Sequence, residues 1–258
     1  MLVSHAYLLG TIGLAIVFTL LCMVRKDLRR VMLYAGFVYL FYMTAVFLLS
    51  RILSSDPAKS ITPGYWGPPS LWDLNKKTGG LGIEDTLYMF FVGAIAAGLY
   101  DTVFKIKLSK KPNKKLKKGH ALLFALVTGS LVFVFTPVNA VYLFIFIQLF
   151  GAAAIVWQRR DLLTHVLLGG LFFMVLYAVL FLIFKLLFPH FLSNYYHLDR
   201  TSHLWLLGIP LEEYLYSFTL GMMWAPLYEY EYRVKDRKNK GRNLAPRRLS
   251  PAAANSRR

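Results

Sequence analysis

The sequence predicts an all-α integral membrane protein, a seven-transmembrane-helix bundle built from two parallel three-helix repeats plus a linking helix. Three observations support this prediction. The 258-residue chain is 57% hydrophobic and has a mean hydropathy of +0.48. Its apolar residues gather in seven blocks of roughly 20 residues, the length that crosses ~30 Å of hydrocarbon. One sequence pattern occurs twice, once in each half of the chain.

The apolar blocks are expected to be helices, because a chain inside lipid satisfies its backbone hydrogen bonds only in helices or closed barrels. The blocks lack the alternation of apolar and polar residues that barrel strands need. Pro137 and Asn139 separate the short fourth block from the fifth, which predicts a tight helical hairpin over residues 121–157. The seven blocks cover residues 3–24, 31–53, 83–104, 121–136, 140–157, 162–188 and 210–230.

The expected organisation has four parts. Residues 1–104 form the first three-helix repeat, and residues 140–232 form the second. Residues 105–139 supply a basic cytoplasmic loop and the linking helix between the repeats. Residues 233–258 are polar and basic and lack apolar periodicity, so we expect a disordered tail there.

The basic residues are distributed unevenly over the expected loops. Of the 30 Lys and Arg residues, 24 fall on one side of a seven-span bundle: four in the first loop, eight after the third helix, two after the fifth and ten in the tail. The positive-inside rule then predicts a multi-pass protein of the plasma or inner membrane, with the N-terminus outside and the C-terminus in the cytoplasm. The opposite side receives the other six: Arg51, Lys59, Lys76, Lys77, Lys185 and Arg200.

The net charge of +17 has two possible meanings. A strongly basic protein often binds nucleic acid. Basic loops beside membrane helices are, however, typical topology signals and contacts for anionic headgroups. We therefore expect membrane lipid as a partner, and no nucleic acid.

The repeated pattern lies at the start of the third and seventh helices. Residues 83–90 read IEDTLYMF and residues 211–218 read LEEYLYSF, at an offset of 128 that continues ungapped to Asp101 and Glu229. A second match, RKDL at 25–28 and RRDL at 159–162, has an offset of 134. Parallel repeats predict a pseudo-two-fold axis along the membrane normal, with a site at the interface between the two repeats.

Each copy of the pattern opens on two acidic residues, Glu84 with Asp85 and Glu212 with Glu213. They could be exposed caps that complement the positive end of a helix dipole. Their apolar neighbours favour a functional role instead, because ionisable groups at such depth are costly. Adjacent residues point ~100° apart on a helix, so one acid of each pair can face the bundle interior while the other faces a loop.

Aromatic residues follow the acids. Burial and mutual repulsion would keep a carboxyl protonated and able to act as a general acid, and aromatic ring faces stabilise cations. The combination suits a reaction that protonates an apolar substrate and forms a carbocation. Core packing or an interfacial belt is the alternative for each ring taken singly. The candidate substrate-binding residues are Tyr88, Phe90, Tyr214, Tyr216, Phe218 and Trp224.

Other site chemistries lack their motifs. The chain has no phosphate-binding glycine loop, no HExxH pattern and one cysteine, Cys22, so no cofactor and no metal site is predicted. His190, His197 and His203 share one loop, but their spacing does not specify a ligand set. No lysine lies between Pro210 and Tyr230, which excludes a retinal-type Schiff base on the seventh helix.

The segments GIPLEEYLYSF and GIEDTLYMFF, each preceded by a loop with an aspartate, resemble the membrane-type lycopene cyclase domain. That family occurs as two small bacterial subunits or as one fused archaeal or fungal chain, with a Pro-x-Glu-Glu signature before the third helix of each half. The resemblance covers residues 1–232. By it Pro210, Glu212 and Glu213 match the second signature, and Glu84 and Asp85 match the first. The first copy lacks the proline and has Asp85 in place of glutamate, which favours the second copy as the acid.

The resemblance implies a redox-neutral intramolecular lyase (an isomerase) that cyclises the ψ-ends of lycopene or a related acyclic carotenoid. An acid protonates the terminal double bond, the neighbouring double bond attacks the resulting cation, and a base removes a proton. The partner is then an apolar polyene, and other membrane enzymes of the carotenoid pathway are further candidate partners. Three alternatives stay open: a non-catalytic carotenoid or lipid-binding protein, an end-group hydratase, and a transporter or proton pathway.

Overall fold

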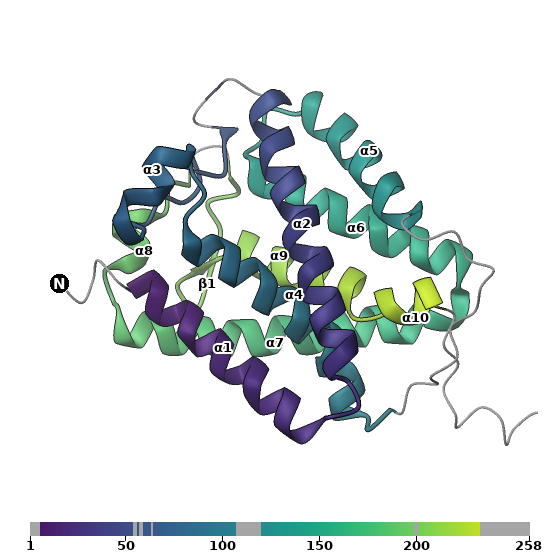
Figure 1. Cartoon of the computed structure of the whole chain (residues 1–258). Coiled ribbons are helices and arrows are strands. Elements are labelled where there is room, and N and C mark those ends of the chain that lie inside the picture. Colours follow the sequence, from purple (N-terminus) through teal and green to yellow (C-terminus); the bar gives the residue numbers. More distant parts are fainter. Residues whose placement is uncertain are drawn as a thin grey trace, which may run out of the picture.

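The computed structural model describes residues 6–53, 56, 59–62, 64–106, 120–198 and 201–232. The predicted tail at 233–258 and seven of the eight lysines after the third helix lie outside these residues. Helices occur in each of the seven predicted blocks, and most of them run alongside one another (Figure 1). The chain is thus predominantly helical, as expected.

The two repeats contain matching sets of helices. The first and second helices of each repeat have equal lengths, 19 and 25 residues, and their bounds lie 134 positions apart. The first repeat holds α1 (Ala6–Val24), α2 (Arg29–Leu53) and α4 (Ile83–Val103), and the second holds α6 (Ala140–Gln158), α7 (Leu163–Leu187), α9 (Leu211–Trp224) and α10 (Leu227–Tyr232).

The packing within the repeats also matches. In the first repeat α4 packs against α1 and α2, and in the second α9 packs against α6 and α7. Between the repeats, α4 contacts both α9 and α7. The third helices of the two repeats therefore meet in the interior of the bundle.

Equivalent glycines allow the close crossings inside each repeat. A Cβ at Gly36 of α2 would lie 2.9 Å from the backbone oxygen of Phe90, and a Cβ at Gly170 of α7 would lie 2.9 Å from that of Phe218. Glycine and other small residues let membrane helices approach closely, since lipid supplies no hydrophobic drive for helix association. Phe90 and Phe218 are thus held at the crossing of α4 with α2 and of α9 with α7.

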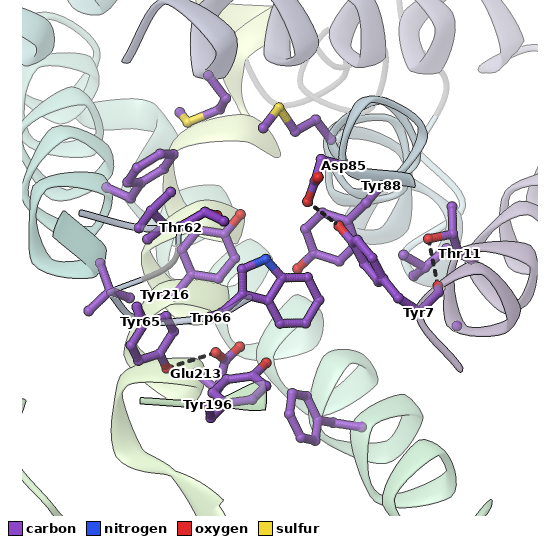
Figure 2. A pocket seen from close by; sticks show the side chains of 18 of the residues that line it. Tyr7, Thr11, Thr62, Tyr65, Trp66, Asp85, Tyr88, Tyr196, Glu213 and Tyr216 are labelled. Atoms are coloured by element: carbon purple, nitrogen blue, oxygen red, sulfur yellow. Dashed lines mark hydrogen bonds between the residues drawn. The ribbon is translucent and has the colours of Figure 1, made fainter. Parts of the chain in front are cut away.

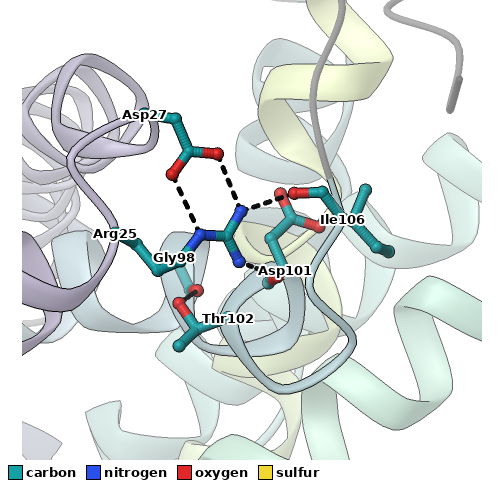
Figure 3. A network of polar contacts seen from close by, with 6 residues as sticks. All are labelled: Arg25, Asp27, Gly98, Asp101, Thr102 and Ile106. Carbon is teal, nitrogen blue, oxygen red and sulfur yellow. Dashed lines mark hydrogen bonds and ion pairs between the residues drawn. The ribbon is translucent and has the colours of Figure 1, made fainter.

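The basic turns of the two repeats form the same network. Arg25 pairs with Asp27 and donates to the backbone oxygen of Asp101 (Figure 3). In the second repeat Arg159 pairs with Asp161 at 2.6 Å and donates to the backbone oxygen of Glu229 at 3.3 Å. Each guanidinium thus joins the turn between the first two helices of its repeat to the far end of the third helical segment.

Among the described residues, five helical segments are long and apolar enough to cross a membrane, at residues 6–24, 29–53, 83–103, 140–158 and 160–187. The linking helix α5 (His120–Val134) has 15 residues and packs against α6 in the expected hairpin, and α9 has 14. At 1.5 Å per residue, helices this short fall below the ~30 Å of the hydrocarbon core. The seven-span arrangement remains a prediction.

The seventh block differs from its prediction because it is broken into α9 and α10 at Ala225 and Pro226. Proline has no N–H to continue the helical bonding pattern. The long loops also contain short elements that the sequence pattern did not predict: a 3₁₀ turn (Leu71–Asp73), α3 (Leu74–Thr78), α8 (Phe191–Tyr195) and the strands β1 (Trp205–Leu206) and β2 (Ile209–Pro210).

Candidate active site

A cavity of about 200 Å³ lies between the two repeats, at the end of the bundle where α4 and α9 begin. Both repeats contribute to its lining, and tyrosine and other aromatic rings dominate it (Figure 2). Two carboxyl groups reach the cavity, Asp85 from α4 and Glu213 from α9. They occupy equivalent positions of the two repeats, and Figure 2 shows them on different sides of the pocket.

Glu213 is held by tyrosine hydroxyls. Tyr65 donates to its Oε1 at 2.8 Å and Tyr177 to its Oε2 at 2.7 Å. Burial, together with the neighbouring carboxyl of Glu213, raises the pKa of Tyr65 well above its usual value, so this loop phenol keeps its proton and can donate it. The Glu213 side chain is 5% exposed. Its carboxyl group therefore lies in an apolar cavity with only hydroxyl partners among the described residues.

Asp85 has different partners, among them a hydroxyl and a backbone N–H. The hydroxyl of Tyr7 on α1 donates to Oδ1 at 2.7 Å, and the backbone N–H of Gly82 donates to Oδ2 at 2.7 Å. In the second contact the side chain of Asp85, in the first turn of α4, accepts from the backbone of the N-cap residue Gly82, as in a capping box. Asp85 thus caps α4 and faces the cavity with the same carboxyl group.

The other two acids hold the long loops. Glu84 accepts the backbone N–H of Leu71 at 2.8 Å, and Glu212 accepts that of Ser202 at 2.7 Å and the hydroxyl of Tyr142 at 2.6 Å. Both are buried, and neither lines the cavity. The burial of Glu84, Glu212 and Glu213 contradicts the alternative in which the acids are exposed caps.

Two hydroxyl pairs connect the repeats crosswise. Tyr88 on α4 lies 3.0 Å from Tyr177 on α7, and Tyr216 on α9 lies 2.6 Å from Tyr39 on α2. Tyr88 and Tyr216 are equivalent residues of the two repeats. Each repeat therefore supports the cavity wall of the other.

A scan against protein-family models matches residues 4–103 and 139–231 to the lycopene cyclase family. The chain belongs to the lycopene cyclase family. The two matched segments contain both copies of the acidic pattern and leave out the basic loop and the linking helix α5. Searches of curated proteins and of solved structures found no match.

The family assignment makes this chain a cyclase-type membrane protein whose substrate class is the carotenoids. Of the six aromatic residues considered from the sequence, Tyr88 and Tyr216 line the cavity of this cyclase family member. The other four lie outside that lining. Phe90 and Phe218 sit at the helix crossings, Tyr214 donates to the backbone oxygen of Leu206, and Trp224 is buried against Tyr39 at a ring-centroid distance of 4.8 Å.

Sequence reasoning missed several residues of the cavity, because they come from helices and loops outside the acidic pattern. Tyr7 comes from α1 and Tyr177 from α7, while Tyr65, Trp66 and Tyr196 come from the two long loops. Trp66 and Tyr196 form an isolated β-bridge, so the loops meet over the cavity. A paired aromatic motif in both loops, YW at 65–66 and YY at 195–196, was the signal available in the sequence.

The lining of this cyclase-family cavity does not favour a metal there. Its polar groups are two carboxyls, threonine and tyrosine hydroxyls and the Trp66 ring nitrogen, and none of the described lining residues is histidine or cysteine. Phenol and carboxyl groups can transfer protons without a cofactor. The arrangement suits acid–base chemistry on an apolar molecule.

Proposed function

We propose that this chain cyclises the ψ-end groups of lycopene or a related acyclic carotenoid by proton transfer, without net oxidation or reduction. The observation that carries the proposal is the pair Asp85 and Glu213, one acid from each repeat, in a single aromatic cavity. One carboxylic acid and one carboxylate are the two groups that such a reaction needs. This proposal rests on the family assignment for its substrate class.

Glu213 is the proposed acid. Its partners Tyr65 and Tyr177 are hydroxyls, which can accept as well as donate a hydrogen bond and so tolerate a protonated carboxyl. Asp85 is the proposed base, because the backbone N–H of Gly82 can only donate and favours the charged carboxylate. The start of α4 favours the same charge through the helix dipole.

The proposed reaction returns every proton that it uses. Glu213 protonates the terminal double bond, and a tertiary cation forms at the adjacent carbon. The neighbouring double bond attacks that cation, forming the ring bond and moving the positive charge onto the ring. Asp85 then removes a ring proton and a new double bond forms. The product is an isomer of the substrate, and proton exchange resets the two acids.

The remaining lining supports this chemistry. Aromatic faces such as those of Tyr88, Tyr216 and Trp66 stabilise a cation by up to about 2 kcal/mol each when desolvated. A cavity of about 200 Å³ is smaller than the roughly 300–1,000 Å³ typical of drug-sized ligands. We therefore infer that one end group enters at a time, while the rest of the polyene stays in lipid.

We also propose the seven-span topology, with the N-terminus outside and the cavity near the outer surface. The uneven distribution of basic residues supports this orientation. The α5–α6 hairpin supports it too, because α5 carries the chain back across the membrane, so that α6 begins the second repeat on the same side as α1 begins the first.

The deciding experiment expresses the chain in lycopene-producing cells and analyses the extracted pigments by chromatography and mass. Ringed products of unchanged mass support the proposal. Products heavier by one water would indicate a hydratase instead, and unchanged lycopene beside normal amounts of membrane protein would indicate a binding or transport protein.

Two matched variants locate the acid in the same assay. Glu213→Gln keeps the shape of the side chain but has no carboxyl proton, so ring formation should fall by roughly 10²–10⁴-fold and lycopene should accumulate. The neighbouring Glu212→Gln is the control and should keep cyclising. Full activity of Glu213→Gln at normal expression would overturn the assignment.

A further inference from the structure

A second buried cluster of polar groups lies outside the proposed site. Asp101 of α4, His165 of α7 and Glu229 of α10 each offer one ligand atom, and these atoms lie within 4.8 Å of one another. The three residues are 1%, 7% and 5% exposed. They come from both repeats, and Asp101 and Glu229 are equivalent positions of the repeated pattern.

The cluster is separate from the cavity. Asp85 and Asp101 both belong to α4, and their separation of 16 positions corresponds to about 24 Å of helix. None of the three residues lines the cavity. The cluster instead lies near the two basic turns, on the far side of the bundle from the acids that open α4 and α9.

Two members of the cluster have unsatisfied polar atoms. The Nε2 of His165 has no hydrogen-bond partner among the described residues, and the carboxyl oxygens of Glu229 have only the carboxyl of Asp101 beside them, a group of the same charge. Leaving a buried polar group unpaired costs about 1–3 kcal/mol, and more when the group is charged. A bound ligand that accepts electron pairs from both nitrogen and oxygen would remove this cost.

The charges around the cluster favour a divalent cation. Arg25 and Arg159 each form an ion pair with an aspartate of their own turn, Asp27 and Asp161. Arg25 also donates a hydrogen bond to the backbone oxygen of Asp101, and Arg159 donates one to the backbone oxygen of Glu229. Carboxyl groups bind metals in their deprotonated form. With a neutral imidazole and all four carboxyls deprotonated, the two guanidinium groups leave two negative charges. A cation of charge +2 would balance them.

We propose that Asp101, His165 and Glu229 bind a divalent first-row transition metal ion such as Zn²⁺ or Mn²⁺. One imidazole and two carboxylates are a donor set that zinc accepts at about 2.0–2.2 Å, and manganese accepts carboxylates as readily. In a tetrahedral zinc site the ligand atoms lie about 3.4 Å apart, so side-chain adjustment closes the cluster on the ion. The ion joins α4 of the first repeat to α7 and α10 of the second and acts as a clamp between them.

The test uses the full chain, purified in detergent by a tag without histidine and freed of metal with a chelator. Zinc is added, excess ion is removed by gel filtration, and bound metal is measured by mass spectrometry, with Mn²⁺ and Mg²⁺ in parallel arms. We expect close to one zinc ion per chain and a higher melting temperature for the zinc-loaded protein, because a ligand that binds only the native state stabilises it.

Three variants with a matched control locate the site. Asp101→Asn, Glu229→Gln and His165→Ala should each lose the bound ion and the zinc-dependent rise in melting temperature. The double variant His190→Ala/His203→Ala removes exposed loop histidines and should keep both. Replacement by Co²⁺ in the unchanged chain adds a readout that needs no variant, since a nitrogen and oxygen site gives visible cobalt absorption bands.

Two outcomes would overturn the proposal. One is a parent chain that retains neither zinc nor manganese and melts at the same temperature with and without them, which would leave the two carboxyls sharing a proton instead. The other is equal metal retention by the parent and the three site variants, with loss only in the loop-histidine control. Both readouts are independent of carotenoid turnover, so failure of the metal proposal leaves the proposed cyclase function untouched.

Discussion

Tyr88 and Tyr177 hold their hydroxyl oxygens 3.0 Å apart, although one belongs to the third helix of the first repeat and the other to the second helix of the second repeat. Tyr177 also donates its proton to Glu213 Oε2 at 2.7 Å. Because a phenol has one proton, Tyr88 is the donor in the contact with Tyr177 whenever Glu213 is a carboxylate. A chain of hydroxyls thus leads from the first repeat to the carboxyl group of the second.

We expect Tyr177→Phe to slow ring formation more than Tyr88→Phe does. Tyr177 bonds the proposed acid directly and stabilises the carboxylate that Glu213 becomes as it gives up its proton. A hydrogen bond to a charged group contributes about 1.5–3 kcal/mol, or roughly 10–100-fold in rate. Tyr88 is one step removed. The measurement is the time course of ringed against acyclic pigment at equal amounts of membrane protein.

Tyr42→Phe is the control for these variants, because Tyr42 donates to the backbone oxygen of Leu122 and does not line the cavity. Its pigment profile should match that of the parent. Equal slowing by all three substitutions would indicate a general packing defect and would contradict the hydroxyl chain.

Asp85→Asn should alter the end of the reaction rather than its start. If Glu213 supplies the proton and Asp85 removes the later one, the asparagine variant still forms a cation but lacks its base. We expect a changed ratio of ring isomers or water-quenched end groups, seen by chromatography and mass. Accumulation of unchanged lycopene in Asp85→Asn, with altered end groups in Glu213→Gln, would instead show that the two roles are exchanged.

Glu212→Ala should destabilise the protein without changing its products. The substitution leaves the Ser202 N–H and the Tyr142 hydroxyl without their acceptor. The expected loss is about 1–3 kcal/mol of unfolding free energy, measured as a lower melting temperature in detergent. Glu212→Gln retains an acceptor oxygen and should recover most of the loss. A normal melting temperature for Glu212→Ala would remove the loop-anchoring role.

The predicted topology can be tested by cysteine labelling from outside intact cells. In a Cys22→Ala background, a cysteine placed at Lys76 should react with a membrane-impermeant reagent, and one at Lys114 should react only after the cells are opened. The expectation follows from the uneven distribution of the basic residues. Labelling of both positions from the same side would exclude the seven-span arrangement.

The helical membrane class of the protein and its internal repeat could be predicted from sequence, because both depend on short stretches of consecutive residues. Apolar runs of sufficient length identify helices for a membrane without knowledge of their neighbours. The RKDL and RRDL turns and the two acidic patterns identify the repeat in the same way. The short α9 and the break at Pro226 differ from the prediction. Hydropathy depends only on the apolar character of the side chains, so it does not show that Pro226 lacks the backbone N–H that a continuous helix needs.

Which acid of each pair faces the cavity was decided only by the tertiary structure. The sequence determined that adjacent acids diverge by ~100°, but the rotation of α4 and α9 about their axes depends on how they pack. Gly36 and Gly170 allow close contact with the backbones of Phe90 and Phe218 at the helix crossings. This packing fixes the rotation of α4 and α9, and Asp85 and Glu213 then face the cavity. Glu84 and Glu212 then point toward the long loops and bind their backbone N–H groups. The aromatic residues of these loops line the cavity because they contact residues distant in sequence. A local sequence pattern does not encode such contacts.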